Sequence, residues 1–371
     1  MVATTETAQP KTTIHTAFGS LHDIRQQGKV QHPLINVIFI ALCGMLCGAD
    51  DWVNIAEFGR SEEKWLSQFL DMPHGTPSHD VFGTVFGFIF FEHFSECFSQ
   101  WIRLLNPDIG KHLAIDGKYA RGSKDGTIGK AAIDVVSVYA TECGLTIAQR
   151  KVDDKSNEIT AIPELLKQLE PLLLLEGSVI TIDAIGLQTN IVNQIDLLGA
   201  FAIISLKGNQ GNLHEDTEKM FDYFQKIDFK DIPHTHFRQV DKGHGRIEIR
   251  EGWAFDPRQY SEYFRTLHKW PSICRVVMLR SERQVGDKVQ VEVRYFISTL
   301  DEPVAVLMTF IRQHWGIENG LHWVLDVAFR EDTQRVRKEN RDANLVTLRH
   351  LVLNLLRLES SKRSIETKRL K

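Results

Sequence analysis

Between residues 111 and 206, strand-like and helix-like patterns follow one another in an order that restricts the fold. Three strand patterns come first, at 113–118, 131–140 and 144–152, and a short turn joins the last two into a hairpin. A helix pattern at 158–169 then precedes a strand at 178–184, a helix at 190–198 and a strand at 201–206. Strands joined by short turns pair antiparallel, whereas strands joined through helices pair parallel. The segment therefore predicts a mixed sheet of class α/β.

Two strands of this sheet end in aspartate. Asp116 lies near the end of the first strand, on the face opposite Leu113 and Ile115, and Asp183 lies at the end of the strand after the first helix. The order of elements is the ribonuclease H-like one, in which the first strand is central and the strand after the first helix is its neighbour. We therefore expect Asp116 and Asp183 to meet at one edge of the sheet.

A third acid lies in a proline-free segment near the end of the chain, at 310–329. An apolar stripe at helical spacing predicts one buried helix; it contains Ile317, Leu321, Val324, Leu325 and Ala328. Beside it, His314, Glu318, His322 and Asp326 recur every four residues and so share one face. A carboxylate beside a buried stripe is costly unless it is paired. We expect Glu318 to join the two aspartates, although for this segment alone the simpler interpretation is a solvated or self-paired polar face of a core helix.

Converging carboxylates repel one another unless cations neutralise them. Ligands that are all oxygen select a hard ion, Mg²⁺ or Mn²⁺. Two such ions about 4 Å apart activate a nucleophile and stabilise the leaving oxygen in phosphoryl transfer. Asp116, Asp183 and Glu318 are thus a candidate site for two ions and for phosphodiester chemistry.

Polar side chains near these acids are suited to a DNA backbone. Trp315 is additionally a candidate for stacking on an unpaired base, although core positions are the simpler interpretation of Trp315 and Trp323. For each of the others, a solvated surface residue is the simpler interpretation. The candidates for DNA contact are Lys118, Arg121, Lys207, Asn209, Gln210, His244, Arg246, Arg250, His314, Trp315, Arg335, Arg337 and Lys338.

Composition indicates which binding partners and which cellular compartment to expect. The chain of 371 residues has a net charge of −4, which does not mark it as a nucleic-acid binder, but residues 330–371 carry 12 Lys and Arg against 6 Asp and Glu. The five cysteines are scattered without a C-x-x-C motif, which is typical of a reducing cytosol. The longest apolar run, 34–47, is too short to cross a bilayer. We expect a cytoplasmic, nucleoid-associated protein with no membrane contact.

The patterns also predict how the chain is divided. The expected parts are a disordered N-terminus at 1–18; a helical module for DNA binding or assembly at 19–108, with one aromatic helix at 81–102; the first part of the core at 109–207; a β-rich insertion at 208–300; the catalytic and C-terminal helices of the core at 301–358; and a basic tail at 359–371.

Six strings resemble the H-repeat-associated family of insertion-sequence transposases, which are DDE enzymes. They are AIDGKYARGS, KSNEITAIPELL, TIDAIGLQ, LKGNQGNLHED, DKGHGRIEIR and HWGIENGLHWVLDVAFRED, and the likeness extends over residues 20–358. It implies that Asp116, Asp183 and Glu318 bind the metal ions. It also implies hydrolysis at element ends, transfer of the freed 3′-OH into target DNA, and a homodimer on double-stranded DNA.

Two features leave alternatives open. A related larger group of transposases carries Arg four residues before its Glu and Lys seven after it, where this chain has His314 and Leu325, so Asp326 stays a second choice for the third carboxylate. Asp134 stands where family members often have His. The competing hypotheses are an endonuclease that does not transpose and a catalytically silent DNA-binding protein derived from an element.

Overall fold

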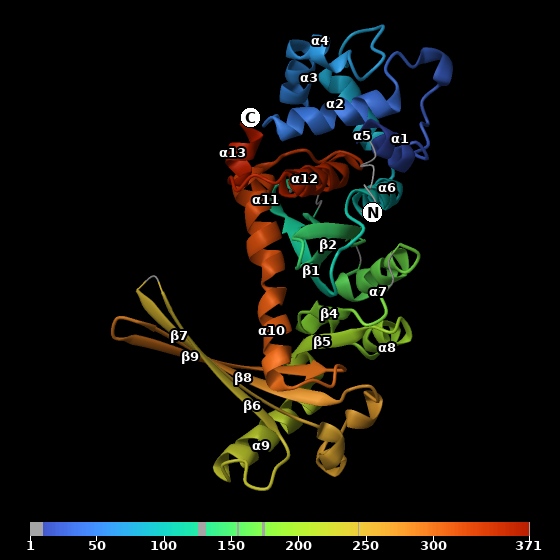
Figure 1. The fold of residues 1–371 in the computed structure, drawn as a ribbon. Helices are drawn as coiled ribbons and strands as arrows, with labels where there is room; N and C mark the ends of the chain where they lie inside the picture. Colours follow the sequence, from blue (N-terminus) through green and yellow to red (C-terminus); the bar gives the residue numbers. More distant parts are fainter. Residues whose placement is uncertain (1–9, 125–130, 154–155, 173–174, 244, 371) are drawn as a thin grey trace, which may run out of the picture. The chain divides into compact units, whose positions relative to one another are not determined.

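The computed structural model describes residues 10–124, 131–153, 156–172, 175–243 and 245–370 (Figure 1). Within it the chain forms two compact units, each assembled from separate stretches of sequence. The first unit contains Met1–Ile109, Gly117–Asn157 and Glu318–Lys371, and the second contains Gly110–Asp116 and Glu158–Ile317. These divisions differ from the parts predicted from the sequence. The boundary between the units passes through strand β1 (His112–Ala120), and the predicted insertion belongs to the same unit as strands of the core.

The second unit is built on a mixed sheet in the order β1-β4-β5-β9-β8-β7-β6. The start of β1 pairs in parallel with β4 (Val179–Ile182), and β4 pairs in parallel with β5 (Phe201–Leu206). The helices α7 (Glu158–Leu169) and α8 (Thr189–Leu197) precede β4 and β5 in the chain. The mixed α/β class and the parallel strands predicted from the sequence are confirmed.

The predicted insertion continues this sheet through antiparallel strands. β5 pairs with β9 (Lys288–Ser298), which is followed by β8 (Arg275–Val285), β7 (Arg246–Phe255) and β6 (Thr235–Gly243). Between β5 and β6 the chain forms a helix that the sequence interpretation missed, α9 (Gly211–Lys226), which buries Leu213, Phe221 and Phe224. The insertion thus extends the core sheet instead of forming a sheet of its own.

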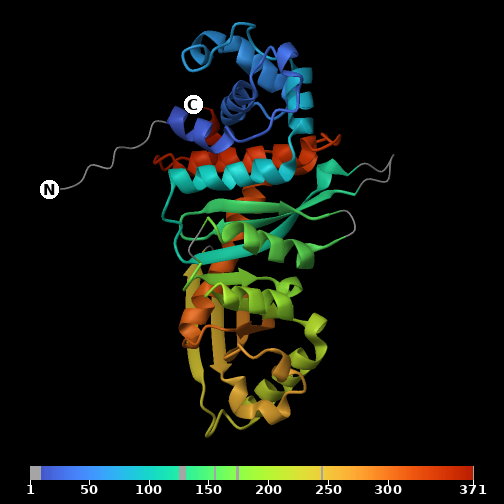
Figure 2. The same ribbon diagram turned by 90° about the vertical axis from the view of Figure 1, so that its right-hand side faces the viewer.

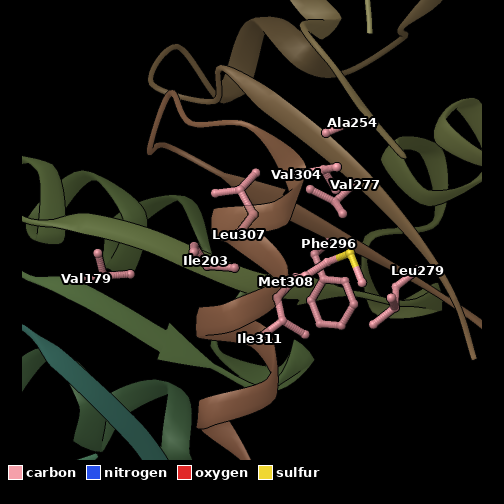
Figure 3. Close-up of a cluster of buried hydrophobic side chains, with 10 residues drawn as sticks. All are labelled: Val179, Ile203, Ala254, Val277, Leu279, Phe296, Val304, Leu307, Met308 and Ile311. Atoms are coloured by element: carbon pink, nitrogen blue, oxygen red, sulfur yellow. The ribbon is translucent and has the colours of Figure 1, made fainter. Parts of the chain in front are cut away.

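Helix α10 (Val304–His314) crosses this sheet and closes the core of the second unit (Figure 3). Its side chains Leu307, Met308 and Ile311 belong to one buried cluster with Ile203 of β5 and Phe296 of β9. Apolar residues at this spacing form a single stripe, so their burial fixes which face of α10 meets the strands. The last residue of α10, His314, still lies on the sheet, beside Thr181 of β4.

The first unit is organised around α12 (Arg341–Leu358), in which nearly every side chain is buried. Figure 2 shows α12 lying alongside α6 (Phe91–Leu105), and both views place α2 (Leu34–Leu46) and α5 (His79–Phe88) beyond α12, on the side away from the strands. The strands of this unit include the antiparallel hairpin of β2 (Ile133–Ala140) and β3 (Leu145–Lys151), as predicted. The other helices of the unit include α3 (Trp52–Ser61), α4 (Glu63–Leu66), α11 (Trp323–Ala328) and α13 (Ile365–Arg369).

The single aromatic helix predicted at 81–102 is wrong. The chain forms α5 and α6, which are bent by 94° at the break. At the break the buried Asn344 donates from Nδ2 to the carbonyl oxygens of Phe86 and Ile89, at 2.7 and 2.8 Å. These bonds satisfy carbonyl groups that a continuous helix would use internally. A distant partner on α12 thus stabilises an interruption that the local pattern does not reveal.

Both predicted ends of the chain need correction. Residues 10–18, expected to be disordered, form helix α1 (Pro10–Phe18), and its Phe18 ring contacts Trp101 edge-on at 5.6 Å between ring centroids. In the predicted basic tail, Arg369 is buried and its guanidinium bonds the carbonyl of Met45 and the carboxylate of Asp50. Burial of apolar and paired groups orders both segments, which composition alone marks as solvated.

For the residues that the structure describes, we find no single helix with the length and apolar character of a membrane span. The bent pair of α5 and α6 reaches those thresholds only when the two are taken together.

Candidate active site

Strands β1 and β4 bring Asp116 and Asp183 to adjacent positions. In the parallel ladder Ile115 is the partner of Ile182, and each aspartate is the next residue along its strand. Asp183 keeps an extended backbone (φ −69°, ψ 171°), so the alignment continues past the last paired residue. Neighbouring strands lie about 4.8 Å apart, and residues in register point to the same face. The sequence-based expectation that these aspartates meet at one edge agrees with this register.

Asp183 is half-exposed and lies beside a cation. Lys207, just after β5, donates from Nζ to both carboxylate oxygens of Asp183, at 3.1 and 3.4 Å. Burial works to raise the pKa of Asp183, but the hydrogen bond from the backbone N–H of Ala184 and the Lys207 ammonium outweigh it, so that its pKa is lowered. Asp183 is therefore a carboxylate at neutral pH, ready to bind a cation.

Two predicted DNA contacts have another function in the structure. Asn209 donates from Nδ2 to the carbonyl of Ala184 at 2.6 Å, and Gln210 donates from Nε2 to the carbonyl of Leu187 at 2.7 Å. These side-chain amides tie the turn after β5 to the loop that follows Asp183. Their donor groups are engaged within the protein, so we assign them to holding this loop instead of to DNA.

A hydrogen-bonded chain runs beneath the aspartates. His314, at the end of α10, bonds through Nδ1 to Thr181 Oγ1 of β4 at 2.9 Å. Thr181 Oγ1 also bonds His112 Nε2 of β1 at 3.0 Å, and His112 Nδ1 bonds Gln313 Oε1 at 3.1 Å. The chain joins α10 to both aspartate-bearing strands. Sequence reasoning missed Thr181 and His112, since neither residue type nor spacing indicates a partner more than 60 positions away.

The tryptophans around Glu318 are on the surface, which overturns the expectation of core positions. Trp315 is 43% exposed and Trp323 is 62% exposed. The guanidinium of Arg294 lies over the Trp315 ring, 4.7 Å from its centroid, and so holds the indole in place. His314, next to Trp315, has its pKa lowered by burial, against the opposing charge of Asp183.

Glu318 is exposed, and the backbone around it departs from the single α-helix predicted for 310–329. After α10 the chain forms a π-helix at Ile317–His322 before α11 begins. Gly320 lies at its centre: its carbonyl accepts from Arg357, and a Cβ at this position would stand 2.6 Å from Tyr139 Oη. Distant contacts at Gly320 therefore accompany the wider turn. Such π-turns occur frequently at functional sites.

Asp326, the second choice for a metal ligand, is paired with a cation. Lys118 Nζ lies 2.8 Å from Asp326, 3.4 Å from Asp332 and 3.6 Å from Glu331. The side chain of Lys118 is only 12% exposed, and these three carboxylates raise its pKa although burial opposes them. This arrangement argues against the predicted DNA contact at Lys118, because its ammonium is surrounded by acids of its own chain.

The remaining residues predicted to contact DNA differ in their exposure and in their partners within the chain. Arg250 pairs with Asp241 and Glu248, and Arg246 pairs with Glu248 at 2.8 Å. Arg337 donates to the carbonyl of Gly122 at 3.3 Å. Arg121, Lys207, Arg246, Arg335 and Lys338 are exposed, whereas His244 lies outside the described residues.

The residues in the second unit suit a hard divalent ion. Asp116 and Asp183 stand at neighbouring positions of a parallel strand pair, and Lys207 already supplies positive charge to Asp183. Throughout the described ranges, no group of three or more His, Cys, Asp and Glu side chains is arranged to hold a metal ion.

Comparison with known proteins identifies the family. Residues 15–102 match the model described as "DDE_Tnp_1-associated", and residues 107–355 match the model described as "Transposase DDE domain". The chain belongs to the DDE transposase family. The resemblance drawn from the motifs is thereby confirmed, and the family makes this protein a DNA transposase, an enzyme that cuts and joins DNA strands.

Curated relatives are similar in sequence to this chain over most of its length. The "H repeat-associated putative transposase YhhI" of Escherichia coli K12 is 35% identical over 90% of this chain and 87% of its own. The "Putative transposase YncI" of Escherichia coli O157:H7 is 36% identical over 90% and 85%. An "Uncharacterized protein in dhlA 3'region" of Xanthobacter autotrophicus is 40% identical over 72% and 88%. This transposase thus matches its relatives across both units.

Proposed function

We propose that this transposase cuts DNA at the ends of an insertion element and joins the freed ends to target DNA at one site formed by Asp116, Asp183 and Glu318. In the first step, water attacks a phosphorus atom and the bond from phosphorus to the 3′ oxygen breaks, leaving a 3′-OH and a 5′-phosphate. In the second step, the 3′-OH attacks a target phosphodiester and releases a target 3′-OH. Each joining step conserves the number of phosphodiester bonds, so it requires no external energy source.

The register of β1 against β4 is the observation that carries this proposal. Two carboxylates side by side on parallel strands repel each other unless a cation lies between them, and Lys207 neutralises only part of that charge. Mg²⁺ or Mn²⁺ held by these oxygens would supply the charge that activates water and stabilises the leaving oxygen. Asp116, Asp183 and Glu318 would hold the ions.

Surface cations near the acids would position the DNA. Arg121 is 82% exposed and Lys207 is 59% exposed, and Arg335 and Lys338 also face solvent. These groups would neutralise phosphates without reading sequence. Trp315, which is 43% exposed, would stack on a base at the cleaved end. Two copies of the chain would act together, one on each element end.

Substitution of each acid tests the assignment. The full-length chain is incubated with its flanking inverted-repeat DNA and Mg²⁺ or Mn²⁺, and nicked and joined products are scored. Asp116→Asn, Asp183→Asn and Glu318→Gln should each lower the cleavage rate by at least roughly 100-fold, because each removes a metal ligand worth several kcal/mol in the transition state.

Two further variants make the test selective. Glu302→Gln, at an exposed acid of the second unit, should cleave at the wild-type rate. Asp326→Asn should retain far more activity than Glu318→Gln. Full activity in Glu318→Gln together with loss in Asp326→Asn would move the third ligand to Asp326. Cleavage without joined products would favour an endonuclease that does not transpose.

A further inference from the structure

Lys118 is the centre of a charged cluster that the catalytic proposal does not use. Its ammonium lies within 3.6 Å of carboxylate oxygens of Asp326, Glu331 and Asp332. Glu331 is itself buried and lies 3.7 Å from the buried Arg349 of α12. Lys118 is therefore enclosed by acids of its own unit and is withdrawn from solvent.

The place of Lys118 in the sequence connects this cluster to the catalytic acids. On strand β1, residues two apart point to the same face, so Lys118 lies on the face that carries Asp116. Its closest partner, Asp326, lies eight residues after Glu318, within α11, which directly follows the π-helix. One side chain thus joins the strand of the first acid to the segment that carries the third.

Independent contacts fix the same segment against the end of β1. The backbone N–H of Arg121 donates to Asp332 Oδ1 at 3.2 Å. A Cβ at Gly122 would stand 2.0 Å from the carbonyl oxygen of Gln334, so only glycine permits this approach. The segment after Glu318 is therefore held by charge, by a backbone hydrogen bond and by close packing.

We propose that Lys118 is a positioning residue, which holds the segment 326–332 against the end of β1 and thereby fixes the segment that carries Glu318. The proposal rests on the proposed function, because it assumes that Glu318 is a metal ligand. Lys118 itself touches neither DNA nor the reacting atoms.

The test compares metal dependence, which a merely structural residue would not change. Mg²⁺ requires near-ideal octahedral ligands, whereas Mn²⁺ tolerates a displaced one more readily. Lys118→Met should lower Mg²⁺-supported cleavage of element-end DNA at least about tenfold, with a clearly smaller loss in Mn²⁺. Binding of the same DNA, measured by gel shift, should remain within about twofold of wild type. Lys118→Arg should recover part of the Mg²⁺-supported rate.

Two variants serve as controls. Lys124→Met, at an exposed lysine close by, should change neither rate nor metal preference. Asp326→Asn, an isosteric change, should shift metal preference in the same direction as Lys118→Met. It replaces Lys118→Met as the test of the proposal if Lys118→Met does not fold.

Two results would overturn the proposal. One is wild-type rates and metal preference in folded Lys118→Met, or in Asp326→Asn if Lys118→Met does not fold. The other is lost DNA binding with normal cleavage at saturating DNA, which would make Lys118 a DNA contact. A wild-type protein inactive with both metals would instead refute the proposed function.

Discussion

At the scale of residues, the proposed site starts from Asp116 and Asp183, which stand at neighbouring positions on two parallel strands. Asp116 lies within β1 after its apolar start, Asp183 directly follows β4, and the order of elements fixes which strands are neighbours. Such information is local and topological, so one sequence contains it. The partners of the surrounding polar residues were not predictable in this way. Lys118 and Asn209 carry donors suited to phosphate, yet each bonds a group of its own chain.

His112 provides a test of the hydrogen-bonded chain beneath the site. Burial, with a smaller contribution from His314, lowers the pKa of His112 to about 4, from about 6.5 in an unfolded chain. Because its folded pKa is the lower one, the folded state loses stability as the pH falls from about 6.5 towards 4. The full shift corresponds to about 3 kcal/mol.

Urea unfolding at several pH values measures this effect. His112→Asn removes the titrating group, so its unfolding free energy should fall less steeply than that of wild type between pH 6.5 and 4. His268→Asn, at an exposed histidine, should follow the wild-type curve. Equal slopes for wild type and His112→Asn would show that His112 does not titrate as its burial requires.

At the scale of elements, periodicity predicted the regular helices and strands but not their interruptions. The apolar stripe at 310–329 correctly marked Ile317, Leu321 and Leu325 as buried. It could not show the π-turn, because that turn coincides with contacts from Tyr139 and Arg357, which are remote in sequence. The break between α5 and α6 has a similar origin, since Asn344 supplies the hydrogen bonds from α12.

Gly320 tests the cause of the π-turn. In Gly320→Ala the new methyl group would stand 2.6 Å from Tyr139 Oη, so we expect a loss of about 1–3 kcal/mol in stability and slower DNA cleavage. Adding Tyr139→Phe removes the oxygen in question, and the nearest remaining atom, Tyr139 Cζ, is at 3.4 Å. The double variant should therefore recover most of the stability in thermal unfolding.

Gly28→Ala is the matched control, because no atom lies within 4 Å of the added group there. Unchanged stability in Gly320→Ala would contradict the packing account, and so would a double variant no more stable than the single one.

At the scale of the whole molecule, each unit is assembled from segments far apart in the chain. The sequence indicated a helical module, a core and an insertion in succession. In the structure, β6–β9 share a sheet and a core with β4 and β5, while the C-terminal helices pack among the N-terminal ones. Long-range burial produces this interleaving, and a single sequence read in order does not contain it. The three proposed ligands consequently come from three separate stretches.

The central claim is that those three carboxylates hold common ions. A crystal structure of the protein with its element-end DNA and Mn²⁺, with the ions located by anomalous scattering, tests it most directly. The account predicts manganese within about 2.3 Å of oxygens of Asp116, Asp183 and Glu318. Manganese bound away from the aspartate pair, or bound to that pair while Glu318 lies too far to coordinate it, would contradict the account.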